Sequence, residues 1–180
     1  TRSPVDLSPP PPPSMSDDAD VERKVATSLE ALGAPFELLR IDPDFADTAA
    51  FCEKYGIPLD HSGNTIIVAS KKEPRQYCAC LVLATTRLDV NHTVRKLLGA
   101  SRVSFATAEE TQALTGMMIG GVTLLALPAD LPVYVDERIM SLDYVILGGG
   151  SRSSKIKISP DALKRLPSLS VVAGLAQAIP

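Results

Sequence analysis

Apolar residues recur along the chain with two different periods, which predicts a fold of intermixed helices and strands. Between Asp20 and Leu32 the apolar positions are spaced by four, four and three residues, the period of an amphipathic helix that ends at Gly33. Apolar runs over Gly63–Ser70 and Tyr77–Ala84 predict two buried strands, joined as a hairpin by the charged turn between them. The sheet is therefore expected to be mixed rather than all parallel.

The other predicted elements follow from cap residues and alternation. Asp47 is the expected N-cap of one helix, and Thr107, with Glu110 three residues later, has the capping-box pattern for another. The alternating charged and apolar residues of Lys155–Ile158 predict a strand at a sheet edge. The predicted helices are 20–32, 48–55, 91–98, 107–114 and one opening at 159, and the predicted strands are 36–41, 63–70, 77–84, 102–105, 131–135, 144–147 and 155–158. Together these predict a single compact α/β domain of the α+β type, with a mixed, mainly antiparallel central sheet flanked by helices.

Composition narrows the classes of function. The chain has 180 residues, 45% of them apolar, a net charge of -3 and a pI near 5.4. This length fits one domain, and the acidic balance argues against an extended nucleic-acid-binding surface and against DNA as a partner. Recognition of one short RNA end by a local patch stays open. Every apolar run is shorter than the roughly 18 residues of a membrane span, so no membrane partner is expected.

The cysteines indicate the cellular compartment. Their odd number, with no secretory signal, predicts reduced thiols in a cytoplasmic protein. Cys78 and Cys80 should point to the same face of a strand, with two small core residues as the simplest interpretation. Only His61 and His92 could add further metal ligands, and neither is spaced as in a zinc motif. We expect neither a metal nor a cofactor.

The first residues predict a leader rather than part of the domain. The proline run Pro9–Pro13 is followed by a cluster of acidic residues, and polyproline makes no internal hydrogen bonds. We therefore expect a disordered leader over residues 1–19 and a folded domain over residues 20–180.

The segment Gly116–Pro128, GMMIGGVTLLALP, is the candidate for a functional backbone bend. Gly120 and Gly121 stand together between apolar residues, where the backbone must turn sharply or let another group approach closely. One interpretation is a tight turn that feeds a buried strand. The other is a bend whose exposed N–H and C=O groups bind a small ligand.

The order of motifs along Val21–Leu166 resembles the YbaK/EbsC group, the domains associated with prolyl-tRNA synthetase. The resemblance rests on GNTIIVAS, the long segment from DVNHTVRKLLGA to ETQALTG, GGVTLLALP, PVYVDERIMSLDYVILGGGSR and KIKISPDALKRL. It implies a YbaK-like editing domain that acts in trans as an aminoacyl-tRNA deacylase. Such an enzyme hydrolyses the ester between a wrongly chosen small amino acid and the terminal adenosine of a tRNA.

The resemblance also implies a site. The glycine bend of the family supplies backbone groups that hold the amino acid and the attacking water, a lysine touches the tRNA terminus, and the terminal ribose hydroxyl helps the hydrolysis. The residues expected at the site are Gly120, Gly121 and Thr123 for catalysis and Thr48, Asn64, Leu124, Gly150, Ser151 and Arg152 for substrate binding.

Two positions depart from the family pattern. Asn64 stands where the family usually has the lysine, and Leu124 where it usually has a proline. Lys71 is a poor replacement, since seven residues of strand span roughly 23 Å. Arg152 is the better candidate for a displaced cation, and His61 a weaker one.

Three hypotheses therefore remain. The first is a deacylase of mischarged tRNA. The second is a non-catalytic module of the same fold that binds aminoacyl-tRNA or a synthetase, which Asn64 and Leu124 favour. The third is a hydrolase of another small aminoacyl or acyl ester, which the acidic pI suits. Fold analogy alone does not choose among them.

Overall fold

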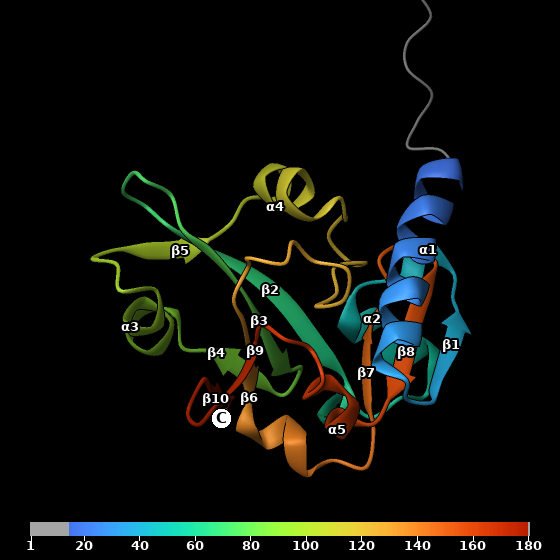
Figure 1. The fold of residues 1–180 in the computed structure, drawn as a ribbon. Helices are drawn as coiled ribbons and strands as arrows, with labels where there is room; N and C mark the ends of the chain where they lie inside the picture. The colour runs from blue at the N-terminus through green and yellow to red at the C-terminus, as the bar shows by residue number, and fades with distance from the viewer. Residues whose placement is uncertain (1–14, 180) are drawn as a thin grey trace, which may run out of the picture.

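A five-stranded mixed sheet forms the centre of the computed structural model, which describes residues 15–179 (Figure 1). The predicted hairpin is confirmed, because β2 and β3 pair antiparallel along most of their length. Two of the remaining pairs, β3 with β6 and β6 with β9, are parallel, so antiparallel pairs do not predominate in this sheet. Its strands, in spatial order, are β5 (Val103–Phe105), β2 (Gly63–Ser70), β3 (Tyr77–Leu83), β6 (Val133–Asp136) and β9 (Leu169–Val172).

A second, three-stranded antiparallel sheet lies beside the first. Its order is β1 (Phe36–Arg40), β8 (Ser154–Ile158) and β7 (Val145–Gly148), so β8 is the middle strand. The prediction that β8 lies at an edge was wrong. Its apolar residues face the main core, as expected, but its opposite face is covered by the start of α2 (Thr48–Tyr55), which buries Lys155. A third pair joins β4 (Thr86–Leu88) to β10 (Ala176–Ala178).

The helices cover both sheets. Asp47 stands at the N-cap position of α2 as predicted, but its side chain makes no capping hydrogen bond. In α4 (Ala108–Thr115), Thr107 and Glu110 form the predicted capping box. The predicted helix over residues 91–98 is instead a π-helical turn, Val90–Val94, followed by α3 (Arg95–Leu98). The last helix, α5 (Pro160–Leu163), has proline at its first turn as expected.

The first helix, α1 (Met15–Leu32), begins five residues before the predicted start, so residues 15–19 are helical and not disordered. Its predicted apolar stripe packs into the main core through Val25 and Leu29. The rest of the predicted leader, residues 1–14, lies outside the described residues. Short 3-10 turns complete the fold at Pro43–Phe45, Leu59–His61 and Glu137–Ser141.

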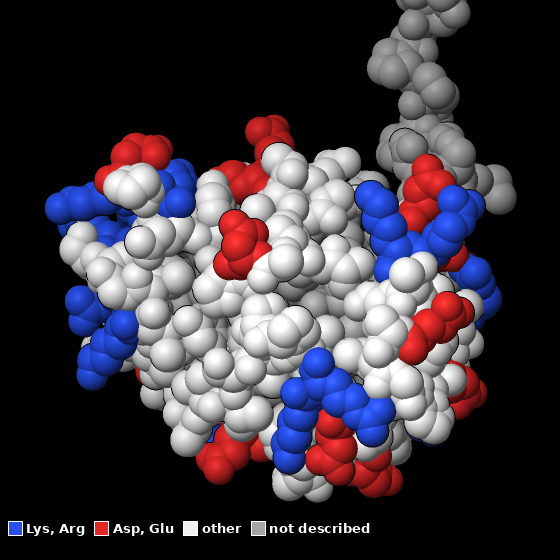
Figure 2. All heavy atoms as spheres, viewed as in Figure 1, with Lys and Arg blue, Asp and Glu red and all other residues white. Residues whose placement is uncertain are grey.

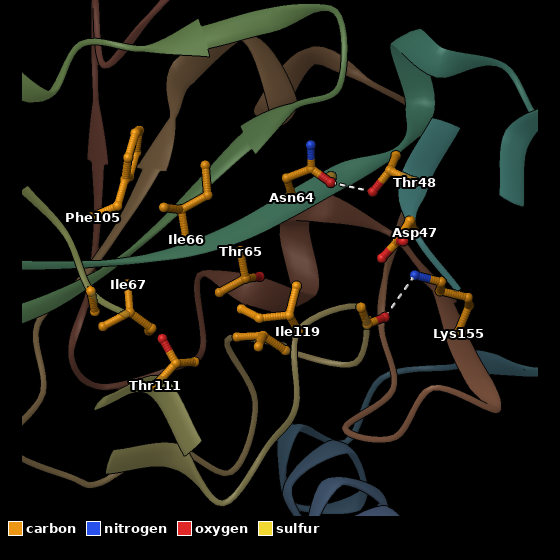
Figure 3. Close-up of a pocket in the computed structure, with 15 residues that line it drawn as sticks. Asp47, Thr48, Asn64, Thr65, Ile66, Ile67, Phe105, Thr111, Ile119 and Lys155 are labelled. Atoms are coloured by element: carbon orange, nitrogen blue, oxygen red, sulfur yellow. Dashed lines mark hydrogen bonds between the residues drawn. The ribbon is translucent and has the colours of Figure 1, made fainter. Parts of the chain in front are cut away.

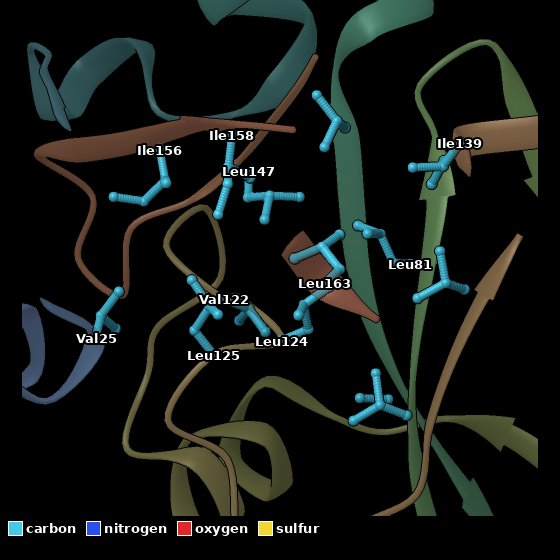
Figure 4. Close-up of a cluster of buried hydrophobic side chains, with 14 of the residues drawn as sticks. Val25, Leu81, Val122, Leu124, Leu125, Ile139, Leu147, Ile156, Ile158 and Leu163 are labelled. Atoms are coloured by element: carbon cyan, nitrogen blue, oxygen red, sulfur yellow. The ribbon is translucent and has the colours of Figure 1, made fainter. Parts of the chain in front are cut away.

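The segment of the double glycine is an irregular loop and not a strand. Residues 116–132 join α4 to β6 without entering a sheet, because Gly120 and Ala126 have positive φ angles of 95° and 58° that interrupt an extended backbone. The stretch from Gly121 to Leu125 is nevertheless buried, and Leu124 and Leu125 belong to the main core together with Leu163 (Figure 4). The loop is therefore held on the core side by hydrophobic packing.

The distribution of charged side chains and the state of the cysteines match what the composition predicted. Figure 2 shows Lys and Arg in separate small groups around a mostly uncharged centre, with no extended basic patch on the face in view. All three cysteines are free and buried. Among residues 15–179 no three His, Cys, Asp or Glu side chains gather as metal ligands would. In the same range, no helix combines the length and apolar character needed to cross a membrane.

Candidate functional site

A cavity of about 370 Å³ opens where β2, the glycine loop, the start of α2 and β8 meet (Figure 3). It brings together residues that are far apart in the sequence. Three of the nine predicted site residues line it, namely Thr48, Asn64 and Gly120. The full lining is Asp47, Thr48, Gly63, Asn64, Thr65, Ile66, Ile67, Phe105, Ala106, Thr111, Ile119, Gly120, Val122, Gly148 and Lys155.

Thr48 and Asn64 are directly bonded on one wall of the cavity. Thr48 is the first residue of α2, after the predicted N-cap Asp47, and Asn64 lies near the start of β2. The Thr48 hydroxyl donates a hydrogen bond to the side-chain oxygen of Asn64. Figure 3 shows the amide nitrogen of Asn64 directed away from Thr48, so Asn64 retains two N–H donors for another partner.

Lys155 supplies the cation of the cavity, and sequence analysis missed it. Its side chain reaches from β8 under the start of α2, where the residue is 6% exposed. The Nζ atom donates to the carbonyl oxygens of Ala46, at 2.7 Å, and Gly120, at 3.2 Å. Burial lowers the pKa of Lys155 to about 8, although the nearby Asp47 carboxylate opposes the shift. The signal that could have found it is a lysine on the strand that follows the glycine turn.

The two glycines of the bend have different roles. Gly120 faces the cavity, and within the described part of the chain no hydrogen bond satisfies its N–H group. The N–H of Gly121 donates to Met118 and its carbonyl accepts from Gly150. A Cβ atom on Gly121 would stand 2.6 Å from the backbone carbon of Ser151, so only glycine fits this close approach.

Arg152 braces the bend rather than facing the cavity. Its guanidinium donates to the carbonyl oxygens of Ile119, at 2.7 Å, and Pro43, at 3.0 Å, and to the Asp47 carboxylate at 3.3 Å. The preceding Ser151 is also structural, because its hydroxyl donates to Glu22 on α1 at 2.6 Å. The structure thus places the predicted displaced cation behind the cavity wall.

The remaining predicted site residues also lie away from the cavity. Gly150 packs against Val21 and Val25 of α1. Thr123 and Leu124 are buried behind the bend, and the Thr123 hydroxyl has no hydrogen-bond partner. His61, the weaker candidate cation, is bonded to Asp60 and Asp143 rather than to any lining residue.

The rim and floor of the cavity combine apolar and polar groups. Phe105 and Ile119 are more than half exposed, with 58% and 53% of their surface accessible, and they line the cavity with Ile66. Thr65 contributes a buried hydroxyl without a partner. No serine, cysteine or histidine is among the lining residues of the described chain, so the site offers backbone N–H, hydroxyl and ammonium groups instead of a side-chain nucleophile with its base.

Comparisons with known proteins agree with this architecture. The model of the aminoacyl-tRNA editing domain family matches residues 42–166. The crystal structure of the hypothetical protein APE2540 superposes with a TM-score of 0.76 at 27% identity, covering 86% of this chain and 99% of that one. A proposed trans-editing enzyme for prolyl-tRNA synthetase superposes with a TM-score of 0.73 at 24% identity, covering 85% of this chain and 95% of that one, and at this identity it supports the fold alone.

The matched region contains the cavity, the glycine loop, α2 and β8, and it spans well over half of the chain. The resemblance seen in the sequence is therefore confirmed. The chain belongs to the family of aminoacyl-tRNA editing domains.

Proposed function

We propose that the protein is a trans-editing deacylase that hydrolyses the ester of a mischarged small amino acid on tRNA. The observation that carries the proposal is that Gly120 lines a small cavity and that its N–H has no hydrogen-bond partner within the described residues. A fixed backbone donor of this kind stabilises the negative charge that develops on an ester carbonyl during attack by water.

The proposed binding mode uses both ends of the cavity. The amino acid enters the cavity with its ester carbonyl toward Gly120, and the terminal adenosine stays at the rim. The free amide N–H groups of Asn64 face the ribose or its phosphate, held in place by Thr48. The ribose hydroxyl next to the ester assists the attacking water, which accounts for a site without a side-chain nucleophile.

Selectivity in this proposal comes from size. The cavity of about 370 Å³ is shared between the amino acid and the end of the tRNA, so little room is left for a large side chain. Exclusion of the larger, correct amino acid is the second sieve that editing requires when binding alone cannot separate similar substrates. Ile66 and Ile119 form the apolar part of this sieve.

The alternative of a non-catalytic module rests on Asn64, which is uncharged and partly occupied by Thr48. Leu124 does not favour the non-catalytic module, because this residue packs in the main core and does not line the cavity. A hydrolase of another small acyl ester is a third candidate. The proposed deacylase would work in the cytoplasm with aminoacyl-tRNA as substrate, whereas the alternative module would partner a synthetase.

The test is the release of free amino acid from a panel of tRNAs charged with alanine, serine and other small residues. Each charged tRNA is incubated with protein and with buffer alone, and free aminoacyl-adenosine esters are included to detect a small-molecule hydrolase. We expect faster release than the blank for at least one tRNA. Release at the blank rate across the panel would rule the deacylase out, and binding without release would support the non-catalytic module.

A further inference from the structure

A buried ammonium group without a contacting carboxylate lies in the cavity wall. The Nζ atom of Lys155 donates to two neutral acceptors, the carbonyl oxygens of Ala46 and Gly120. The nearest candidate counterion, Asp47, makes its ion pair with Arg152 instead, at 3.3 Å. Within residues 18–179, whose side chains the structure describes, Lys155 takes part in no salt bridge, so no carboxylate neutralises its ammonium by contact.

Such an arrangement favours an anionic ligand. An ammonium group has three N–H donors, and two of those on Lys155 are used by the two carbonyls. Lys155 lines the cavity (Figure 3), so the third donor can be given to a ligand there. A buried charge is costly unless an opposite charge or hydrogen bonds compensate it, so a negative group in the cavity would be bound strongly.

We propose that Lys155 and the Gly120 N–H form an oxyanion-binding site, in which Lys155 is a catalytic residue that stabilises the tetrahedral intermediate of deacylation. This inference rests on the proposed function. Water attacks the ester carbon, and the carbonyl electron pair moves to the oxygen that the two donors hold. The intermediate then collapses, the ester C–O bond breaks, and the leaving ribose oxygen takes the proton that the water lost. The products are a free amino acid and a deacylated tRNA, and Lys155 keeps its three protons throughout.

The groups around Lys155 set the pH range in which it carries its charge. Burial and the positive charge of Arg152 lower its pKa, whereas Asp47 and Cys52 raise it, and the result is about 8. The ammonium form therefore predominates at neutral pH and is lost as the pH rises through this value.

The first experiment compares three lysine variants in the deacylation assay. We expect Lys155→Met to lower kcat by about 100-fold with KM changed by less than about 3-fold, the pattern for a contact made only in the transition state. Lys155→Arg keeps the positive charge and should therefore retain most of the wild-type kcat. The matched control is Lys157→Met, two residues along the same strand, where the ammonium lies 4.4 Å from the centre of the Tyr144 ring and outside the cavity. It should change kcat by less than about 2-fold.

The wild-type pH profile tests the same idea without a variant. After subtraction of the buffer blank, kcat should fall above about pH 8 as Lys155 loses its proton. In Lys155→Arg the fall should disappear up to about pH 10, because arginine stays charged there. Thermal melting of each variant shows whether it is folded. A Lys155→Met enzyme that is folded and has an unchanged kcat would overturn the inference and leave the deacylase proposal intact.

A binding measurement separates the two proposals. The probes are an adenosine ester of an α-aminoalkylphosphonate, which is tetrahedral and anionic, and the corresponding planar, neutral adenosine amide. We expect the wild type and Lys157→Met to prefer the anionic probe by at least about 10-fold and Lys155→Met to lose that preference. If the wild type shows this preference but releases no amino acid, the deacylase fails and the oxyanion site stands. Absence of the preference in the wild type overturns the oxyanion site.

Discussion

The guanidinium of Arg152 donates a 2.7 Å hydrogen bond to the carbonyl oxygen of Ile119, the residue before the double glycine. The peptide bond between Ile119 and Gly120 is trans, so its N–H points away from the carbonyl and therefore away from Arg152. Arg152 thus helps to set the direction of the Gly120 N–H, one of the two donors on which the proposed chemistry depends. In the proposed site Arg152 is therefore a positioning residue, whereas the sequence led us to expect a cation that binds the tRNA.

Replacement of Arg152 by glutamine should lower kcat by about 10- to 100-fold and leave KM within about 3-fold. Without the arginine the Gly120 N–H is no longer held in one direction, and the hydrogen bond that this weakens is made mainly in the transition state. The control is Arg165→Gln, which also removes an arginine–carbonyl bond, the 2.6 Å contact with Leu32, but far from the cavity. Steady-state kinetics of both variants provide the comparison. Equal losses in the two would mean that Arg152 serves stability alone.

Two buried threonine hydroxyls without partners, Thr65 and Thr123, form a matched pair. Replacing either by valine should stabilise the fold by about 1 kcal/mol, since an unsatisfied buried hydroxyl is removed. Thr65 lines the cavity and Thr123 does not, so only Thr65→Val should raise KM or lower kcat. Denaturant unfolding and deacylation kinetics test both halves. A large kinetic loss in Thr123→Val would restore the catalytic role first expected for that residue.

The two glycines of the bend should fail differently when changed to alanine. Gly121→Ala places a Cβ against the backbone of Ser151 and should lower the free energy of unfolding by about 2–3 kcal/mol. In Gly120→Ala the new Cβ meets the flexible end of Arg152, so the stability loss should be smaller, near 1–2 kcal/mol, while activity falls with the displaced brace. Gly56→Ala is the control, because Gly56 has a positive φ of 66° and open space where the Cβ would stand. It should lower the free energy of unfolding only through the strain of that backbone conformation. A fully active Gly120→Ala enzyme would argue against the bend as the catalytic element.

Asn64→Lys should strengthen tRNA binding. A new ammonium on β2 would face the ribose or its phosphate at the cavity wall, and one more phosphate contact should steepen the slope of log K against log salt by about 0.7 to 0.9. Asn64→Met, of similar length but uncharged, is the control. The measurement is the dissociation constant for uncharged tRNA at several salt concentrations. An unchanged constant and slope would show that Asn64 does not face the phosphate.

The stability of the protein should rise with pH above neutrality because of Lys155. Its pKa is about 8 in the folded protein and 10.5 in the reference state, so between these values the unfolded chain binds more protons. The free energy of unfolding therefore increases with pH across this window, by up to about 3 kcal/mol at 1.36 kcal/mol per pKa unit. Lys155→Met should lack this rise. The measurement is the free energy of unfolding of the wild type and of Lys155→Met, each from denaturant curves at pH 8 and at pH 10. The same change in the free energy of unfolding between pH 8 and pH 10 in both proteins would contradict the lowered pKa.

Much of the fold was readable from the sequence where local signals and tertiary packing agree. The run GNTIIVAS matches β2 residue for residue, and the helix over 48–55 and the capping box at Thr107 are present as predicted. The family resemblance identified the correct domain. In these segments apolar periodicity, cap residues and burial all favour the same element.

The site was harder to predict because it depends on which surfaces become covered. The alternation of β8 predicts a half-exposed strand, and nothing local reveals that α2 lies over Lys155 or that β8 has a neighbour on each side. The apolar run after Gly121 was equally ambiguous between a strand and a buried loop, and the positive φ at Ala126 is not visible in the residue type. Gly150, Ser151 and Arg152 are near the bend, as the motif order indicated, but on its far side.

The loop that carries Gly120 is tied into the protein interior by Leu124 and Leu125, while the rim residues Phe105 and Ile119 are more than half exposed. If the protein acts as proposed, reaction chemistry and choice of substrate belong to separate parts of the molecule. In the proposed deacylase, mutations at these two rim positions should change which amino acid is removed, with little effect on folding or turnover. A lineage with this fold could therefore acquire a new target through a few surface substitutions, keeping the inherited machinery unaltered.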